Sequence, residues 1–239
     1  MSPARAGGRG GRGGRGSGVA GNERLTALAG SILLVLFAAE IITIVLLREL
    51  MLWHFVVGVL LVGPVAVKTA STGWRFLRYY MRDAAYRRKG PPLLLMRVLS
   101  PILILATFTV IGSGIALAIT GPAPDVLLKM HVVSFLVWLV LVIAHVVAYG
   151  ARAVTSVRED WRRRTAGVPR EPAGRGARLA VNTAAFACAI LPAALIAPTA
   201  AAWDGWFGQP LTGFGVLAVI AIAATALAVI AARGARRRR

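Results

Sequence analysis

Long apolar segments alternate with short polar connections along most of this chain. Each segment is close to the ~20 residues that a helix needs to cross the hydrocarbon core of a bilayer. The pattern predicts an all-α, polytopic membrane helical bundle with six transmembrane helices. The expected spans are Leu25–Leu47, Met51–Ala70, Leu93–Ile119, Asp125–Gly150, Leu179–Pro198 and Leu211–Ala232.

Composition agrees with a membrane protein and adds an orientation. Of the 239 residues, 57% are hydrophobic, and the formal net charge is +19. Nearly all Lys and Arg residues lie in the two tails and in the 72–92 and 151–178 connections, while the other connections hold almost none. Cytoplasmic loops carry such an excess of positive charge. The sequence therefore predicts a bacterial plasma-membrane protein with both termini in the cytoplasm.

The chain divides by composition into five parts. Residues 1–24 are rich in Gly and Arg and have little apolar surface to bury, so we expect a disordered cytoplasmic tail. RGG-like repeats can bind RNA, but on a membrane protein a basic tail beside anionic lipid is the commoner meaning, and we expect no nucleic-acid partner. The remaining parts are a four-helix core (25–150), a cytoplasmic loop (151–178), two additional helices (179–232) and a basic tail (233–239).

Three histidines lie within the apolar segments. His131 and His145 are fourteen residues apart, about 21 Å along a helix, and project from nearly the same side of it. His54 lies in another span. A histidine in an apolar helix can simply be a hydrogen-bonded core residue. Ionisable groups inside a membrane are rare and usually functional, however, and two imidazoles on different helices can hold a flat metal macrocycle such as haem.

Depth favours one pair of these histidines as metal ligands. His54 and His131 both lie near the start of spans that run in the same direction, so we expect their rings at one level near the outer face. Gly58, Gly112 and Gly114 could let a porphyrin lie against the backbone there. The alternative is ordinary helix packing, for which small residues are also favoured.

The sequence offers fewer candidate ligands for a second haem near the inner face of the membrane. Fourteen residues after His54 the chain has Lys68 rather than a histidine, and we expect its ammonium group to reach the cytoplasmic interface. His145 is therefore open to three interpretations: a ligand of a second haem with an unusual or missing partner, a group in a proton or quinone site, or a residue without a role.

Glu40 is a further charge at membrane depth, and three hypotheses remain open for it. Its carboxylate could accept a hydrogen bond from the second ring nitrogen of a ligating histidine. It could also carry a proton, or it could pair with Arg48 or Lys129 near the outer surface.

These motifs resemble a known family. The HxxxG pair of His54 and Gly58, with the spaced residues His131, Phe135, Trp138 and His145, is similar to bacterial membrane b-type cytochromes, namely cytochrome b561-like and ferric-reductase-like transmembrane domains. The resemblance covers about residues 25–150 and implies haem b. Such families often carry two bis-histidine haems, which need four ligands. This chain has three histidines, so one haem on His54 and His131 is expected and a second stays open.

The function expected is electron transfer across the plasma membrane. The chain shows no soluble domain of a size to hold flavin or nicotinamide, so we expect an electron carrier or oxidoreductase subunit without catalytic residues of its own, served by a quinone or a separate redox partner protein. The rival hypothesis is a cofactor-free small transporter or structural membrane protein. A transporter would be expected to show broken helices with polar groups near the middle of the membrane.

Overall fold

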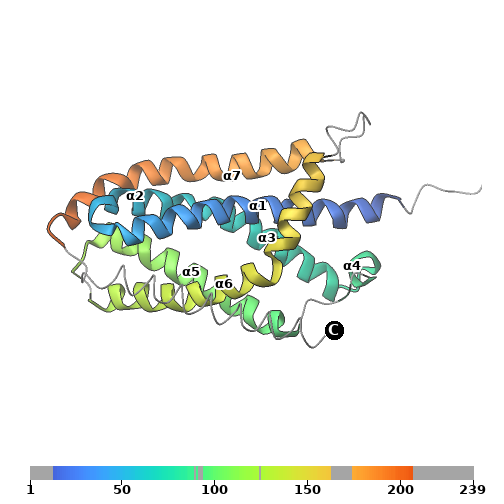
Figure 1. The fold of residues 1–239 in the computed structure, drawn as a ribbon, viewed down its shortest axis with the longest axis horizontal. Helices are drawn as coiled ribbons and strands as arrows, with labels where there is room; N and C mark the ends of the chain where they lie inside the picture. Colours follow the sequence, from blue (N-terminus) through green and yellow to red (C-terminus); the bar gives the residue numbers. More distant parts are fainter. Residues whose placement is uncertain (1–12, 89, 91–93, 124, 163–173, 207–239) are drawn as a thin grey trace, which may run out of the picture.

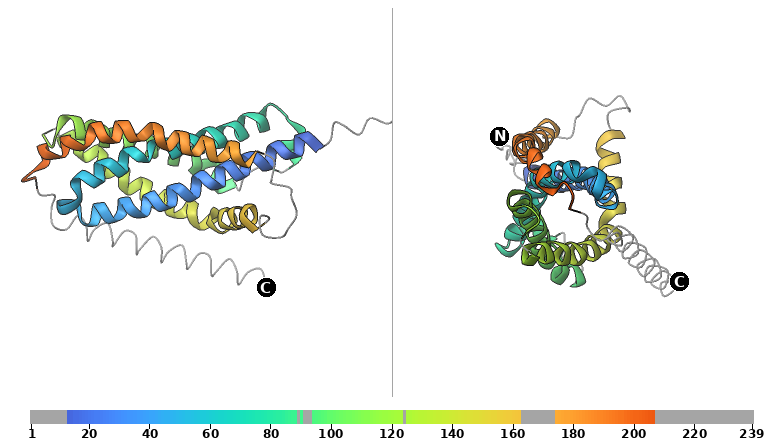
Figure 2. Two further views of the ribbon diagram at one scale, coloured as in Figure 1. Left: turned by 90° about the horizontal axis from the view of Figure 1, so that it is seen from above. Right: turned by 90° about the vertical axis from the view of Figure 1, so that its left-hand side faces the viewer.

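A computed structural model describes residues 13–88, 90, 94–123, 125–162 and 174–206, and these form helices without any strand. The long helices lie side by side in one bundle (Figures 1 and 2). In chain order the elements are α1 Gly13–Val45, α2 Leu47–Leu60, α3 Val62–Tyr80, α4 Ala84–Arg88, α5 Leu94–Thr120, α6 Asp125–Arg162, α7 Arg175–Ile196 and the 3₁₀ helix η1 Ala197–Trp203.

Five segments of the described chain are long and apolar enough to cross a membrane: Gly18–Val45, Leu47–Tyr80, Arg97–Thr120, Asp125–Gly150 and Arg175–Trp203. The all-α class and the membrane-helix character expected from the sequence are therefore confirmed. The sixth expected span, Leu211–Ala232, and the basic tail lie outside the described residues.

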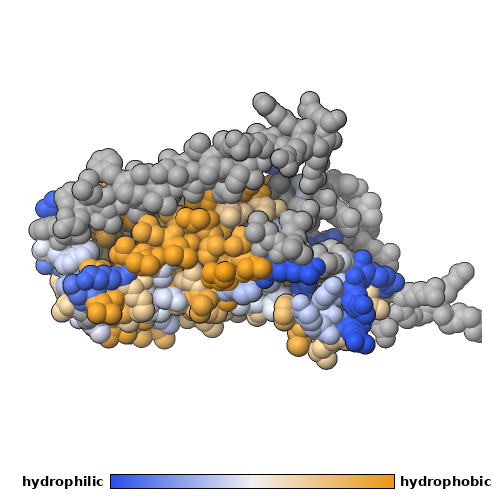
Figure 3. Space-filling model, turned by 90° about the horizontal axis from the view of Figure 1, so that it is seen from below, coloured by the Kyte–Doolittle hydropathy of each residue, from blue (hydrophilic) through white to orange (hydrophobic). Residues whose placement is uncertain are grey.

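The outer surface of the bundle suits contact with lipid. Large apolar side chains point outward from several helices, and Val35, Leu105 and Leu195 are each about 70% exposed (70%, 68% and 71%). Figure 3 shows one such face, where an apolar band in the middle is flanked by hydrophilic residues towards both ends. Exposed apolar area of this extent is rare on soluble monomers and marks a membrane or partner surface.

The first helix begins earlier than expected. We predicted disorder for residues 1–24, but α1 begins at Gly13, so the later part of that segment is helical. Polar contacts with α3 help to explain the difference. The Asn22 amide donates to the Ser71 carbonyl at 3.0 Å, and the Thr26 hydroxyl donates to the Ser71 hydroxyl at 2.8 Å. Composition alone does not reveal such contacts between distant segments.

The second span differs most from the expected Met51–Ala70. It comprises two helices, α2 and α3, which meet at Leu61 and together extend from Leu47 to Tyr80. Pro64 is fully buried just inside α3. Proline has no N–H to donate to the carbonyl four residues earlier, and its ring crowds that carbonyl, so a helix breaks or bends there.

The next two spans form a hairpin with nearly the expected bounds. α5 and α6 are joined by a short turn in which Gly121 has φ +74°, a left-handed conformation that glycine adopts without steric cost. α6 continues beyond the expected end at Gly150 to Arg162, and this extension leaves the bundle axis at a steep angle (Figure 1).

α7 is part of the packed bundle, although the sequence suggested an added pair of helices outside a four-helix core. A Cβ atom on Gly63 would collide with the Ala185 carbonyl oxygen, so α3 and α7 approach each other backbone to backbone. The η1 segment also contributes to the core, because Trp203 packs edge-on against Phe55 of α2 with ring centroids 5.9 Å apart.

Candidate functional site

The tight turn between α1 and α2 builds the surroundings of His54. α1 ends at Val45 and α2 begins at Leu47, so the chain reverses at Leu46. This reversal places Glu40 opposite His54, whose Nδ1–H donates to the Glu40 Oε1 atom at 2.9 Å. The Thr43 hydroxyl lies 3.3 Å from the same nitrogen and donates to the Glu40 carbonyl at 2.8 Å.

The α5–α6 hairpin builds the surroundings of His131 in a different way. The His131 Nδ1–H donates to the Val110 carbonyl oxygen at 3.0 Å and lies 3.1 Å from the Ser113 hydroxyl. Ser113 is buried, and its hydroxyl donates to the Thr109 carbonyl at 2.6 Å. Both acceptors of His131 therefore come from α5.

These contacts determine the tautomer of both rings. A carboxylate and a backbone carbonyl can only accept hydrogen bonds, so Nδ1 carries the proton in His54 and in His131. In a neutral imidazole the other nitrogen, Nε2, then presents a lone pair. This is the state in which an imidazole binds a metal while its second nitrogen is held by a partner.

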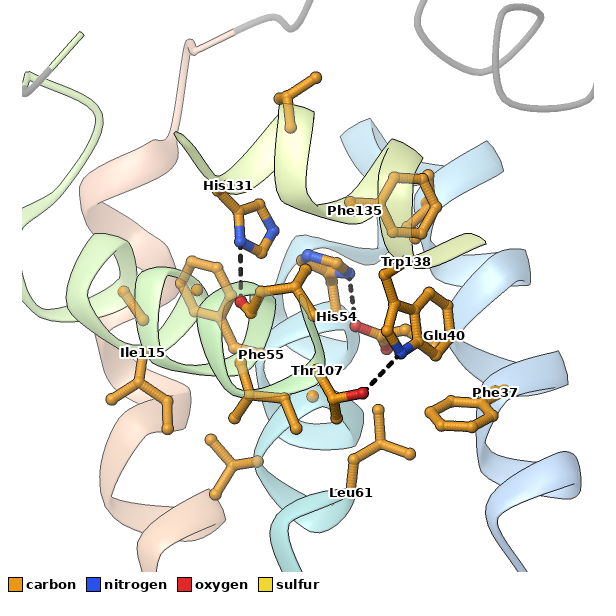
Figure 4. Close-up of a pocket in the computed structure, with 18 of the residues that line it drawn as sticks. Phe37, Glu40, His54, Phe55, Leu61, Thr107, Ile115, His131, Phe135 and Trp138 are labelled. Atoms are coloured by element: carbon orange, nitrogen blue, oxygen red, sulfur yellow. Dashed lines mark hydrogen bonds and ion pairs between the residues drawn. The ribbon is translucent and has the colours of Figure 1, made fainter. Parts of the chain in front are cut away.

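The two rings face each other. Their centroids are 6.3 Å apart, and their planes meet at 79°. Figure 4 shows that the nitrogens not engaged in the drawn hydrogen bonds lie on the facing sides of His54 and His131. The expected juxtaposition of these two histidines is present, and the ring nitrogens that remain free face the space between α2 and α6.

A cavity of about 390 Å³ surrounds the pair. This volume is within the 300–1,000 Å³ typical of ligand sites. The wall is mostly apolar and aromatic, and includes Trp138, whose indole N–H donates to the Thr107 hydroxyl at 3.1 Å. Further lining residues are Phe37, Ile41, Ile44, Phe55, Val59, Leu61, Ile111, Ile115, Phe135 and Ile196.

The three glycines singled out from the sequence have different positions. Gly58 and Gly114 line the cavity, and Gly112 is not among its lining residues. A Cβ on Gly114 would lie 2.9 Å from His131 Cε1, and one on Gly58 would lie 3.4 Å from Glu40 Oε1, whereas one on Gly112 would meet no atom within 4 Å. Gly114 therefore makes room for the His131 ring, whereas a Cβ on Gly58 would make only an ordinary van der Waals contact with Glu40.

His145 does not line this cavity. Its ring packs against that of Tyr149 with centroids 5.0 Å apart, and its Nδ1 atom is buried without a hydrogen-bond partner among the described residues. The Lys68 ammonium group is directed at α1, where it donates to the Thr26 carbonyl at 3.4 Å.

For Glu40 the structure shows the expected contact with a histidine. Its carboxylate accepts from His54, and Lys129 instead pairs with Asp125 at 3.3 Å. Sequence reasoning did not identify Thr43 or Ser113 as part of the site. Thr43 lies one turn after Glu40, and Ser113 lies between Gly112 and Gly114. Both are polar residues close in the sequence to residues already chosen as candidates, and this spacing could have identified them.

Comparisons with protein-family models, curated proteins and solved structures gave no match. The fold and site define a class: an all-helical protein in which five described membrane-length segments line an apolar cavity, and two histidine side chains project into it.

Proposed function

We propose that this protein is a membrane haem b electron-transfer protein that holds one haem between His54 and His131. The observation that carries the proposal is that the imidazoles of His54 and His131 face each other, with ring centroids 6.3 Å apart. Imidazole–metal bonds are roughly 2 Å long, and a ring nitrogen lies about 1.1 Å from the ring centre, so two rings on opposite sides of one metal ion are about 6 Å apart.

The pair of ligands that face each other suits a macrocycle. Haem brings four equatorial nitrogens and needs only two axial ligands from the protein. Its iron would supply a one-electron carrier, and the wall around the histidines is mostly apolar.

The protein's own groups prepare both ligands. The carboxylate of Glu40 and the carbonyl of Val110 hold the Nδ1 protons, and this fixes each ring's orientation and makes each Nε2 a better donor to metal. The two partners differ in charge. His54 is paired with a carboxylate, so it would donate more electron density to a metal than His131.

The expected setting is the bacterial plasma membrane with both termini in the cytoplasm. The support is the concentration of Arg and Lys in the tails and in the 72–92 and 151–178 connections. Electrons would be exchanged with a quinone or a separate redox partner protein, and the chain would act as a carrier or subunit rather than as a self-contained enzyme.

The direct test is a reduced-minus-oxidised visible spectrum of protein purified from a haem-replete host. A sharp α band of low-spin haem b supports the proposal. Purified, folded protein without haem absorbance would contradict the proposal.

One observation favours the rival function, a cofactor-free transporter. The second span has a non-helical residue, Leu50 (φ −117°, ψ 24°), inside α2, four residues before His54 of the cavity wall. Discontinuous helices surround the substrate sites of many transporters. A colourless protein whose cavity binds a small solute would favour this function.

A further inference from the structure

A small pocket between α1, α6 and α7 is lined by three arginines and shares no lining residue with the histidine cavity. Arg24 comes from α1, and Arg175 and Arg178 come from the first turn of α7. Ser156 of α6 adds a hydroxyl group. The part of α6 beyond Gly150 reaches this pocket because it leaves the bundle axis and crosses towards the start of α7 (Figure 1).

The electrostatics of the pocket favour an anion. Three guanidinium groups carry like charges, and α7 begins at Arg175, so the positive end of the helix dipole lies beside them. No acidic residue is among the described residues that line the pocket. Cations are favourable at the last turn of a helix rather than the first, so these positive groups are brought together against their mutual repulsion. An anion bound between them would offset that repulsion.

Arg178 provides the most specific geometry in the pocket. Although charged, the residue is only 7% exposed. A Cβ on Gly174 would lie 3.5 Å from the Arg178 Nη1 atom, so the guanidinium folds back over the start of α7. A guanidinium has several N–H donors in a planar fork, so it can keep its contacts within the protein and still donate to a ligand. This fork matches two oxygens of a phosphate group.

The size and level of the pocket indicate which anion fits. Its volume is about 50 Å³. A cavity needs roughly 10–15 Å³ to hold one water molecule, so there is space for a group the size of a phosphate. Arg24 and Arg175 lie near the starts of membrane-length segments, and Ser156 lies just beyond the end of another at Gly150. The pocket is therefore at the level where apolar segments meet polar sequence, which is the level of lipid headgroups.

Apolar side chains beside the arginines favour a lipid over a free ion. Leu28, Val157 and Leu179 complete the wall of the pocket, and Leu179 is 43% exposed on the surface of the bundle. A phospholipid presents an anionic phosphodiester next to acyl chains, whereas inorganic phosphate has no apolar part. Basic pockets between membrane helices bind anionic headgroups in this way.

We propose that Arg24, Arg175 and Arg178 bind the phosphodiester group of an anionic phospholipid, with an acyl chain along Leu28 and Leu179. The inference is independent of the haem proposal. It also differs from the lipid contact expected for the Gly- and Arg-rich tail, because two of the arginines belong to α7 and all three line one pocket. A lipid bound here would link the start of α7 to α1 and to the extension of α6.

The test is native mass spectrometry of the purified full-length protein in detergent, titrated with palmitoyl-oleoyl phosphatidylglycerol. Arg24→Gln and Arg175→Gln should each weaken binding by roughly tenfold or more, because each removes charge-assisted hydrogen bonds to the ligand. Arg178→Lys keeps the charge but loses the fork, and should weaken binding roughly fivefold or more. Arg88→Gln is the matched control, since Arg88 is exposed on α4 and lies outside the pocket. Size-exclusion profiles verify that each variant is folded.

Two further titrations identify the source of the anion. Palmitoyl-oleoyl phosphatidylcholine has a phosphodiester group without net charge, and should bind at least about tenfold more weakly than phosphatidylglycerol. Equal affinity for the two lipids, or an equal loss of binding in Arg88→Gln, would overturn the proposal. Inorganic phosphate that binds through Arg24 and Arg175 more tightly than phosphatidylglycerol does would also overturn it, because the site would then take a free ion from solution.

Discussion

The Cε1 atom of His131 lies 2.9 Å from the point that a Cβ on Gly114 would occupy. Real Cβ atoms essentially never approach another atom so closely, so even a methyl group at position 114 would push the imidazole away from its observed place. Glycine at this position is therefore a condition for the histidine pair, quite apart from any contact with a ligand.

Gly114→Ala should consequently reduce the haem content of the purified protein to less than about half, because a displaced His131 loses its alignment with His54. Gly112→Ala is the matched control two residues away, where a Cβ would meet no atom within 4 Å. The measurement is the low-spin α band per mole of protein. Equal haem content in Gly114→Ala and Gly112→Ala would show that haem binding does not depend on the position of the His131 ring.

Removing either axial ligand should abolish the low-spin signal. His54→Ala and His131→Ala each leave one imidazole, which cannot complete two axial bonds. His145→Ala should retain at least about half of the signal, since His145 does not line the cavity. If His145→Ala lost all haem while His54→Ala kept it, the ligands would have to be sought at the other end of α6.

Glu40→Ala should weaken haem retention without removing a ligand. The substitution leaves the Nδ1–H of His54 without its carboxylate partner, and losses of such partners typically cost about 10–100-fold in metal affinity. Haem transfer to apomyoglobin, followed over time, reports the change. Glu49→Ala provides the control because Glu49 is exposed. Identical transfer rates for the two variants would exclude a positioning role for Glu40.

Substitution at the α3–α7 contact should lower thermal stability. Gly63→Ala places a methyl group against the Ala185 carbonyl, and overpacking of this kind costs about 1–3 kcal/mol. That loss corresponds to a fall in Tm of roughly 2–4 °C per kcal/mol for a chain of this size. At Gly73 a Cβ would meet no atom within 4 Å, so Gly73→Ala should be neutral or slightly stabilising.

Membrane topology can be tested with reporter fusions. Fusions after residues 85 and 165 should report the cytoplasm, and fusions after residues 122 and 205 the opposite side, because the first two connections carry the positive charge. A cytoplasmic report at 122 or 205 would contradict the proposed orientation.

The histidine pair could be predicted because it depends on two regular quantities. The rise per residue of a helix gives depth, and span boundaries give direction, so His54 and His131 could be placed at one level without knowledge of the fold. The hydrogen-bond partners of His131 could not be predicted from the sequence, because they depend on how α6 is rotated about its axis relative to α5. Only the packed structure shows that Val110 and Ser113 face the ring.

The helix ends also could not be predicted accurately from the sequence. Hydropathy marks where a helix leaves the hydrocarbon region rather than where it stops, so α3 continues to Tyr80 and α6 to Arg162 through polar sequence. The contribution of α7 was missed for a related reason. Its close approach depends on Gly63 in another helix, and a glycine in an apolar span does not indicate which neighbour it meets.

Each imidazole receives its hydrogen-bond partners within a single helical hairpin. Glu40 and Thr43 reach His54 across the Leu46 turn, whereas Val110 and Ser113 reach His131 across the Gly121 turn. The site therefore consists of two half-sites, each encoded by contiguous sequence and each able to form as its hairpin inserts. Cofactor capture would then coincide with the docking of two prepared hairpins, and a chain divided in the 81–93 connection should regain the site by fragment complementation.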